Sequence, residues 1–116
     1  MAGAHADADR ASPPVLELAR ALADPTRLRI FMRLRQEERC VRDLVDTEGI
    51  PQPLVSHHLK VLSDAGLVQT RRADRFRLYS LSPDGMEHAL AAVAALLDPG
   101  RLVPAARPGG NETCCS

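Results

Sequence analysis

Three cysteines carry the most distinctive chemistry in this chain of 116 residues. Cys40 stands alone in the first half, whereas Cys114 and Cys115 are neighbours near the end. A cysteine thiolate is both a nucleophile and a ligand for soft metal ions. Three cysteines in a protein expected to be cytoplasmic argue against a disulfide framework. The cysteines therefore indicate either thiol chemistry or metal binding.

A second group of residues, between 50 and 66, combines a helical apolar pattern with side chains that can hydrogen-bond a base edge or a phosphate. The apolar positions are 54, 55, 58 or 59, 62 and 65, a spacing that predicts one buried helix face. The polar side chains of the opposite face are Gln52, Ser56, His57 and Lys60. Such a helix is typical of the DNA-reading helix of a helix-turn-helix. An ordinary amphipathic helix with a solvated face is the alternative.

The segment after this helix changes to a period of two residues and is rich in arginine. Residues 67–72 and 75–81 predict two strands that turn at Ala73 and Asp74. Residues 51–80 contain five positive and two negative side chains, a local charge of +3. The cationic side chains of the hairpin are Arg71, Arg72, Arg75 and Arg77. A basic hairpin beside a reading helix indicates contact with phosphates.

Length and composition limit the classes of protein to which this chain can belong. The chain is long enough for one domain, and with 3% aromatic residues and no Trp its core must be aliphatic. Small aliphatic helical domains often complete their core by pairing, so we expect a homodimer. A formal net charge of zero gives no global signal for nucleic acid. There is no apolar run of about 18 residues and no signal peptide, so we expect a cytoplasmic protein with no membrane partner.

Start and stop signals place the remaining helices. Asp24 and Ser82 are predicted N-caps because each precedes a proline, and Gly49 is a predicted C-cap. The first helix begins at Pro13, and the others span about 25–37, 40–48 and 83–97. The first helix is apolar nearly all round, which indicates burial against a second subunit. We divide the chain into a flexible N-terminus (1–12), a folded domain (13–98) and a flexible tail (99–116) that carries Cys114 and Cys115.

Two details of side-chain packing follow from the helical spacing. In helix 25–37 the expected buried residues are Leu28, Phe31, Met32 and position 34 or 35, and the arginines at 27, 29 and 33 lie outside that face. In the reading helix His57 and His58 cannot both face DNA, since neighbours on a helix lie about 100° apart. We expect His57 to point outward and His58 to be partly buried.

Several runs of residues together closely resemble the ArsR/SmtB family of metal-responsive repressors. The match extends over about residues 15–97, and its motifs are Ala21–Ile30, Pro53–Leu62, Ala65–Val68 and Arg77–Leu81. The resemblance implies a mainly α (α+β) winged helix-turn-helix with five helices and a two-stranded β-hairpin wing. It also implies a homodimer formed by the first and last helices, which binds double-stranded operator DNA and releases it when an inducer binds. The family usually has a glycine at the wing tip, where this chain has Ala73 and Asp74; Asp tolerates a left-handed turn.

The physical interpretation of the residues agrees with that resemblance. Helix 52–65 can enter the major groove with Gln52, Ser56 and His57 directed toward bases or phosphates. Lys60 and the four hairpin arginines are expected to hold phosphates or the flanking minor groove. We therefore predict that these eight residues bind operator DNA.

The sensing site has to be argued from this chain because family members bind different ions at different places. One family site on the last helix uses Asp, His, His and Glu across the dimer; this chain offers only Asp84, Glu87 and His88 there, which is not a full set. Arsenic sensors carry Cys-Val-Cys at the third helix. Here the first cysteine is Cys40, but Arg42 occupies the second position.

The tail cysteines can supply the missing thiolates. Residues 98–114 span up to about 50 Å when extended, so Cys114 and Cys115 can reach Cys40 of the same or the other subunit. As(III) or Sb(III) needs three sulfurs in a pyramid, whereas zinc or cadmium prefers a fourth ligand. Cys40 follows Arg39 at a helix start, which favours the thiolate. The predicted inducer is therefore As(III) or Sb(III), held by all three cysteines.

Other interpretations remain open. The same repressor can sense another thiophilic metal (Cd, Zn or Pb) or thiol oxidation, and Cys40 can be an ordinary half-buried residue. A small thiol redox or metal-trafficking protein is a further alternative, although it leaves the basic hairpin without a purpose. We do not expect an enzyme, because the chain has no Gly-rich phosphate loop and no evident nucleophile–base arrangement.

Overall fold

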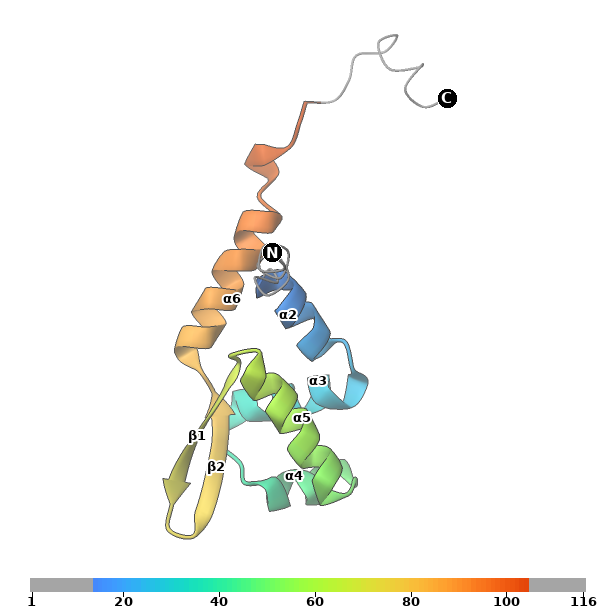
Figure 1. Ribbon diagram of the computed structural model, residues 1–116, viewed down its shortest axis with the longest axis vertical. Coiled ribbons are helices and arrows are strands. Elements are labelled where there is room, and N and C mark those ends of the chain that lie inside the picture. The colour runs from blue at the N-terminus through green and yellow to red at the C-terminus, as the bar shows by residue number, and fades with distance from the viewer. Residues whose placement is uncertain (1–13, 105–116) are drawn as a thin grey trace, which may run out of the picture.

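The computed structural model of the chain describes residues 14–104 (Figure 1). The predicted N-terminal segment 1–12 lies outside the described residues, and so do Cys114 and Cys115. The helices are α2 (Pro14–Leu22), α3 (Pro25–Gln36), α4 (Val41–Glu48), α5 (Gln52–Asp64) and α6 (Pro83–Leu96), with a 3-10 turn at Pro99–Arg101. The strands β1 (Val68–Ala73) and β2 (Phe76–Leu81) form one antiparallel hairpin. The predicted five helices and two-stranded hairpin are confirmed.

The capping residues act as the sequence predicts. Asp24 Oδ2 accepts a hydrogen bond from the backbone N–H of Arg27 at 2.9 Å, and this caps α3. Ser82 Oγ accepts one from the N–H of Gly85 at 3.0 Å at the start of α6. Gly49 ends α4 with φ 68°, a left-handed conformation that glycine adopts without steric cost. Local chemistry therefore defines three of the helix ends.

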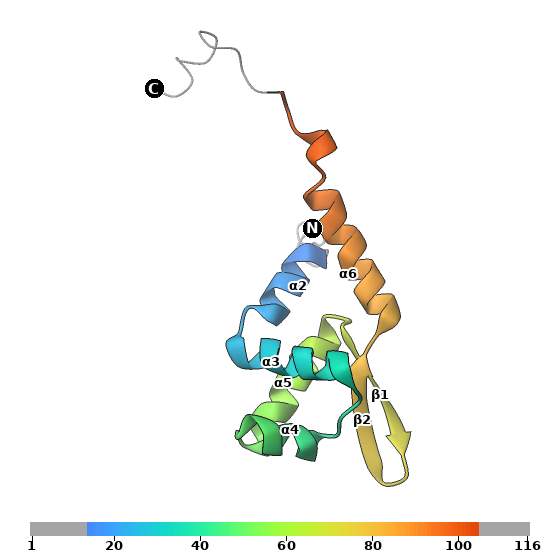
Figure 2. The same cartoon turned by 180° about the vertical axis from the view of Figure 1, so that it is seen from behind.

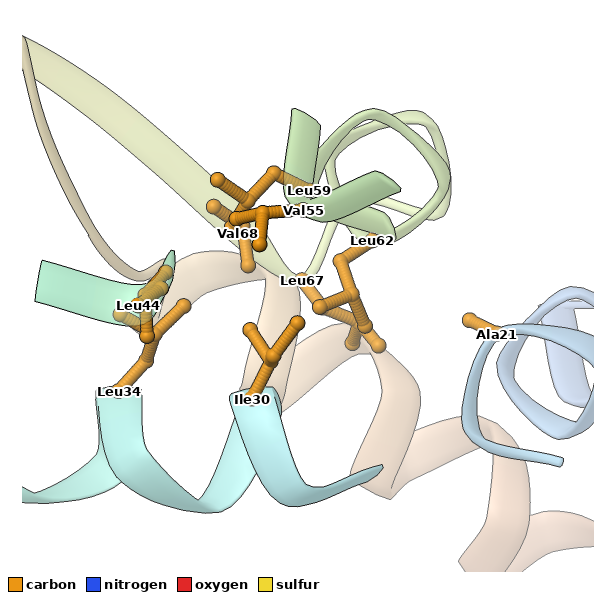
Figure 3. Packing of buried hydrophobic residues seen from close by; sticks show 9 residues of the cluster. All are labelled: Ala21, Ile30, Leu34, Leu44, Val55, Leu59, Leu62, Leu67 and Val68. Atoms are coloured by element: carbon orange, nitrogen blue, oxygen red, sulfur yellow. The ribbon is translucent and has the colours of Figure 1, made fainter. Parts of the chain in front are cut away.

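An aliphatic core lies between α3, α4, α5 and the start of β1, with Ala21 of α2 at its margin (Figure 3). Its members are Ala21, Ile30, Leu34, Leu44, Val55, Leu59, Leu62, Leu67 and Val68. The predicted buried face of α3 was wrong at Leu28 and Met32, which are 39% and 48% exposed. It was right at Leu34, which is buried, and at Phe31, which is partly buried against the core. The two fully buried residues of α3 are Ile30 and Leu34, which lie one turn apart and face α4 and α5. Leu54 is also exposed, since it lies in the first turn of α5.

The hairpin turns one residue later than predicted. The register pairs Ala73 with Phe76, so Asp74 and Arg75 form the turn. Asp74 has φ 62°, which confirms that this residue takes the left-handed position. A further antiparallel bridge joins Arg39 to Tyr79, with N–H···O distances of 3.0 and 2.8 Å. The segment between α3 and α4 thus attaches the start of α4 to β2.

The elements divide between the two ends of the molecule. In both views α2 and α6 lie at one end, and α4 and the hairpin lie at the other (Figures 1 and 2). Helix α6 buries none of its residues fully; Leu90 and Leu96 are 69% and 64% exposed. Among the described residues, no helix has the length and apolar character that crossing a membrane requires.

Candidate nucleic-acid interface and the thiol groove

Helices α4 and α5 form a helix-turn-helix that presents one polar face to solvent. The turn between them runs from Gly49 to Pro51, and α5 then buries Val55, Leu59 and Leu62. The predicted reading residues all lie on the exposed side of α5: Gln52, Ser56, His57 and Lys60. The structure therefore brings these four residues onto one face, and their contact with DNA stays a prediction.

The wing arginines lie on both faces of the hairpin. Arg72 and Arg77 are direct cross-strand partners, so two positive side chains stand opposite each other on one face. Arg71 pairs with Leu78 on the other face. Like charges in this arrangement destabilise a hairpin unless an anion neutralises them.

Two of the predicted DNA-binding cations already have carboxylate partners. Arg71 donates from Nε and Nη2 to the two carboxylate oxygens of Glu38, both at 2.8 Å. This hydrogen bonding holds the pKa of Glu38 below its ordinary value. Lys60 lies 3.2 Å from Asp64 one turn along α5. Within residues 14–104, the wing arginines at 72, 75 and 77 have no such ion pair.

A groove of about 600 Å³ joins the predicted thiol to the predicted DNA-binding residues. It lies between the start of α4, the start of α5 and the hairpin. Its lining includes Cys40, Arg42, Gln52, Arg75 and Arg77. The sequence indicated each of the two groups separately, but not that they share one surface. Arg42 is the residue that sequence reasoning missed as a member of this cationic groove.

Cys40 occupies the N-cap position of α4 and is half-buried. Its side chain makes no capping hydrogen bond, so the thiol is not engaged in holding the helix. Among the described residues no group of three His, Cys, Asp or Glu side chains is placed to hold a metal ion. A site at Cys40 therefore needs ligands from elsewhere in the chain or from a second subunit.

The position of α6 limits how Cys114 and Cys115 can reach Cys40. Helix α6 runs away from α4, so the described chain ends at the opposite end of the molecule from α4, the helix that Cys40 precedes (Figure 2). The ten residues from 104 to 114 span about 36 Å at most. A tail that reaches Cys40 must therefore turn back along the molecule or extend toward a second subunit.

The last-helix residues line a different cavity of about 640 Å³ between α2, the end of α5 and the start of α6. Asp84 and His88 are part of its lining, together with Glu17 and Asp64, whereas Glu87 is not. These residues are not among any group that could hold a metal ion within the described chain.

Three arginines of α3, predicted to lie outside the packed face, instead make its principal polar contacts. Arg29 and Arg33 both bind Glu48 at the end of α4, whose side chain is only 2% exposed. Burial alone would raise the pKa of Glu48, but hydrogen bonds from Arg33 and Arg29 outweigh it and leave that pKa below its ordinary value. Arg27 reaches His58, which was expected to be partly buried and is only 6% exposed. A long arginine side chain can reach sideways to a partner that helical periodicity does not reveal.

A helix-turn-helix with an exposed polar second helix, followed directly by a two-stranded hairpin, defines the winged helix-turn-helix class. Comparison with known families is consistent with this class: residues 24–70 match the model of the bacterial regulatory proteins of the arsR family.

Relatives and solved structures resemble this chain over most of its described length. The transcriptional repressor SmtB of Mycobacterium tuberculosis is 51% identical over 79 residues, which are 67% of this chain and 58% of that protein. The arsenical resistance operon repressor of Staphylococcus xylosus is 35% identical over 71 residues, 61% of this chain and 68% of that protein. This chain thus spans little more than half of the SmtB relative.

Two solved structures share the fold. One, named as a possible transcriptional regulator for arsenical resistance, has a TM-score of 0.57 and 37% identity, with 72% of this chain and 83% of that chain covered. The other is the homodimeric winged helix-turn-helix DNA-binding domain from Mycobacterium bovis, with a TM-score of 0.60, 26% identity and coverage of 82% and 88%. The chain belongs to the ArsR family. That family consists of transcriptional regulators, which agrees with the expectation that the chain is not an enzyme.

Proposed function

We propose that this protein is a cytoplasmic, homodimeric transcriptional repressor that releases its operator when a thiophilic metalloid binds its cysteines. The observation that carries the DNA-binding part is the groove in which Gln52 of the reading helix and Arg75 and Arg77 of the wing lie together. The reading helix and the wing therefore face the same side, as one DNA duplex requires. The unpaired cations of this face supply phosphate contacts, and the polar face of α5 supplies contacts to base edges.

Dimerisation is supported by the apolar surface that the isolated chain leaves open. Leu90, Leu96 and Leu97 of α6 and its end are 64–69% exposed, and Leu16 of the adjacent α2 is 39% exposed. Two copies that pack these helices together would remove this surface from water. The two-fold axis of such a dimer places two reading helices against two half-sites of an imperfect palindrome.

The proposed inducer is As(III) or Sb(III), bound by Cys40, Cys114 and Cys115. Arsenous acid exchanges its three hydroxyl groups for the sulfurs of three thiols, and each thiol proton leaves with one hydroxyl group as water, so no fourth ligand is needed. Cys40 begins the helix that supports the reading helix, and it lines the groove with Gln52 and Arg77. A tail drawn to Cys40 would displace α4 and α5 and would also crowd the DNA-binding groove. The coupling needed for release is on the order of 1–3 kcal/mol or more.

Operator release measured by fluorescence anisotropy tests both parts of this proposal. The labelled duplex is one that the wild-type protein selects from a random-sequence library. Specific binding that weakens steeply with salt is expected for the DNA-binding part. Reduced protein should then release the duplex at near-stoichiometric arsenite.

Cysteine variants separate the inducer from the DNA-binding part. Cys40→Ser and the double variant Cys114→Ser/Cys115→Ser should bind the duplex and retain it in arsenite. Release by cadmium or peroxide, but not by arsenite, would leave the DNA-binding part intact and replace the inducer with another thiophilic metal or with thiol oxidation. Metal binding without any DNA affinity would favour a metal-trafficking protein instead.

A further inference from the structure

The side chain of Arg27 joins three elements of the fold. Its Nε donates to the carbonyl of Ala21 at 2.7 Å, and its Nη2 donates to the carbonyl of Arg20 at 3.2 Å. Both carbonyls belong to the last turn of α2, where backbone acceptors lack helical partners. Its Nη1 lies 3.1 Å from Nδ1 of His58 on α5. Since Arg27 itself is in the first turn of α3, one guanidinium connects α2, α3 and the reading helix.

This contact requires a neutral His58. A guanidinium is only a donor, so Nδ1 of His58 must accept and the ring proton must be on Nε2. Nε2 faces Oδ2 of Asp24 at 4.0 Å, beyond hydrogen-bond distance. The side chain of His58 is only 7% exposed. Protonation would place a hydrogen and a positive charge on the atom that now accepts from Arg27.

We propose that Arg27 is a positioning residue for the reading helix, and that protonation of His58 releases it and weakens operator binding. The dimer contacts proposed above involve α2, and the DNA contacts involve α5. The Arg27–His58 hydrogen bond is therefore a direct polar link between the dimer axis and the DNA-reading surface. The inference rests on the proposed DNA binding and adds a proton-dependent regulation to it.

The surroundings of His58 determine the direction of the pH effect. The charged or titratable groups that face it are Asp24 before α3, Arg27 on α3 and His57 on its own helix. Burial lowers the pKa of His58 below the ordinary value of 6.5; Asp24 opposes this effect, whereas Arg27 and His57 add to it. The imidazole is therefore neutral at neutral pH, and the link is complete above about pH 6.5. The hydrogen bond from Arg27 is lost as the pH falls through the folded-state pKa of His58, which lies below 6.5.

Operator affinity measured against pH in the full-length dimer tests the proposal. For wild-type protein we expect the affinity to stay constant above about pH 6.5 and to fall as the pH is lowered through the folded-state pKa of His58. His58→Asn keeps an acceptor near the Nδ1 position but cannot titrate, so its affinity should change little over that range. His58→Phe keeps a ring without an acceptor and should bind about tenfold more weakly at every pH. Arg27→Lys should resemble His58→Phe near neutral pH, because an ammonium cannot reach three separated acceptors.

A control variant and an NMR measurement distinguish positioning from a general loss of structure. His88→Asn, a change at an exposed histidine of α6, should keep the wild-type pH profile. Identical pH profiles for wild type and His58→Asn would overturn the proposal.

Imidazole NMR of the DNA-free dimer provides a readout that does not depend on the proposed function. The ¹H–¹⁵N correlations of the histidine rings report which nitrogen carries the proton. We expect His58 to be the Nε2–H tautomer at neutral pH in wild-type protein and to lose that preference in Arg27→Lys. An Nδ1–H tautomer would refute the link even if operator binding holds. Failure of the wild type to bind any selected duplex would refute the proposed function and leave the tautomer measurement to decide the link.

Discussion

Gly85, in the first turn of α6, lies directly against the backbone carbonyl of Gly66, just beyond the end of the reading helix. A Cβ placed on Gly85 would be 1.7 Å from that carbonyl oxygen and 2.9 Å from its carbon. Gly66 has φ 82°, so it turns the chain sharply between α5 and β1. The backbone of Ser82 also donates to the carbonyl of Leu67 at 2.9 Å. The last helix is therefore attached to the end of the reading helix through backbone contacts that leave no room for a side chain.

The first prediction concerns this contact. On helix propensity alone, Gly85→Ala would stabilise α6 by up to about 1 kcal/mol. The clash should reverse that sign and lower the free energy of unfolding by about 1–3 kcal/mol. It should also weaken operator binding by moving α6 from the end of α5. Urea unfolding measures the first effect, and Gly100→Ala is the matched control because its Cβ would meet only the side chain of Asp98 at 3.3 Å. Equal stabilities for the two variants would contradict the prediction.

The second prediction concerns the buried carboxylate that clamps α4 to α3. Glu48→Gln should lower the free energy of unfolding near neutral pH by about 1–2 kcal/mol, because Arg29 and Arg33 lose their charged acceptor. The pKa of Glu48 is below its ordinary value of 4.5 in the folded protein. The stabilisation is therefore present above about pH 4.5 and is lost as the pH falls through the lower folded value.

Urea midpoints for wild type and Glu48→Gln, measured near neutral pH and in acid, check this sign. The difference between them should shrink as the pH is lowered. Glu37→Gln is the control, because Glu37 pairs with Arg39 on the surface and is itself 65% exposed. That change should cost about 0.5 kcal/mol or less. A difference between wild type and Glu48→Gln that grows in acid would rule out the clamp as described.

The third prediction concerns competition for Arg71. In the free protein its guanidinium is held by both oxygens of Glu38, so a DNA phosphate must displace that carboxylate. Glu38→Gln should therefore raise operator affinity by a few-fold, in line with the small energies of exposed ion pairs. Titration of labelled duplex at several salt concentrations gives the affinity and its salt slope. If Glu38→Gln binds DNA less tightly than wild type, Glu38 organises the wing for DNA instead of competing for it.

The fourth prediction concerns the facing pair of Arg72 and Arg77. Replacing Arg77 with threonine removes a like-charge pair and should raise the stability of the free protein by about 0.2–1 kcal/mol. The same change should weaken DNA binding and reduce the salt slope by about one for each subunit of the dimer. Thermal unfolding without DNA and salt-dependent anisotropy with DNA measure the two effects. Loss of stability together with unchanged DNA affinity would show that Arg77 has a structural role only.

Interactions between residues close in the sequence were sufficient to predict most of the secondary structure. Asp24 and Ser82 define the starts of α3 and α6 because an N-cap oxygen and a following proline act over three residues. The exposure of His57 and the burial of His58 follow from their 100° separation on one helix. Asp74 supports the wing turn without the glycine usual in the family, since its side chain tolerates positive φ.

Contacts between distant residues were decided only by the tertiary structure. The buried face of α3 has Ile30 and Leu34 instead of Leu28 and Met32, because nearly every position of that helix is either apolar or arginine and the neighbouring helices select the face. The bridge from Arg39 to Tyr79 and the ion pair from Arg71 to Glu38 join segments more than 30 residues apart. No short-range pattern encodes such pairs.

The candidate site divides in the same way. The residue types at Cys40, Gln52 and Arg77 were sufficient to indicate a thiol group and a DNA-binding group. Their position in one groove depends on how α4, α5 and the hairpin pack around the core. The link from Arg27 to His58 likewise needs α2, α3 and α5 to meet at one point. Sequence periodicity describes one helix at a time. The contacts of the Arg27 guanidinium involve three helices, so they are determined only once all three are packed together.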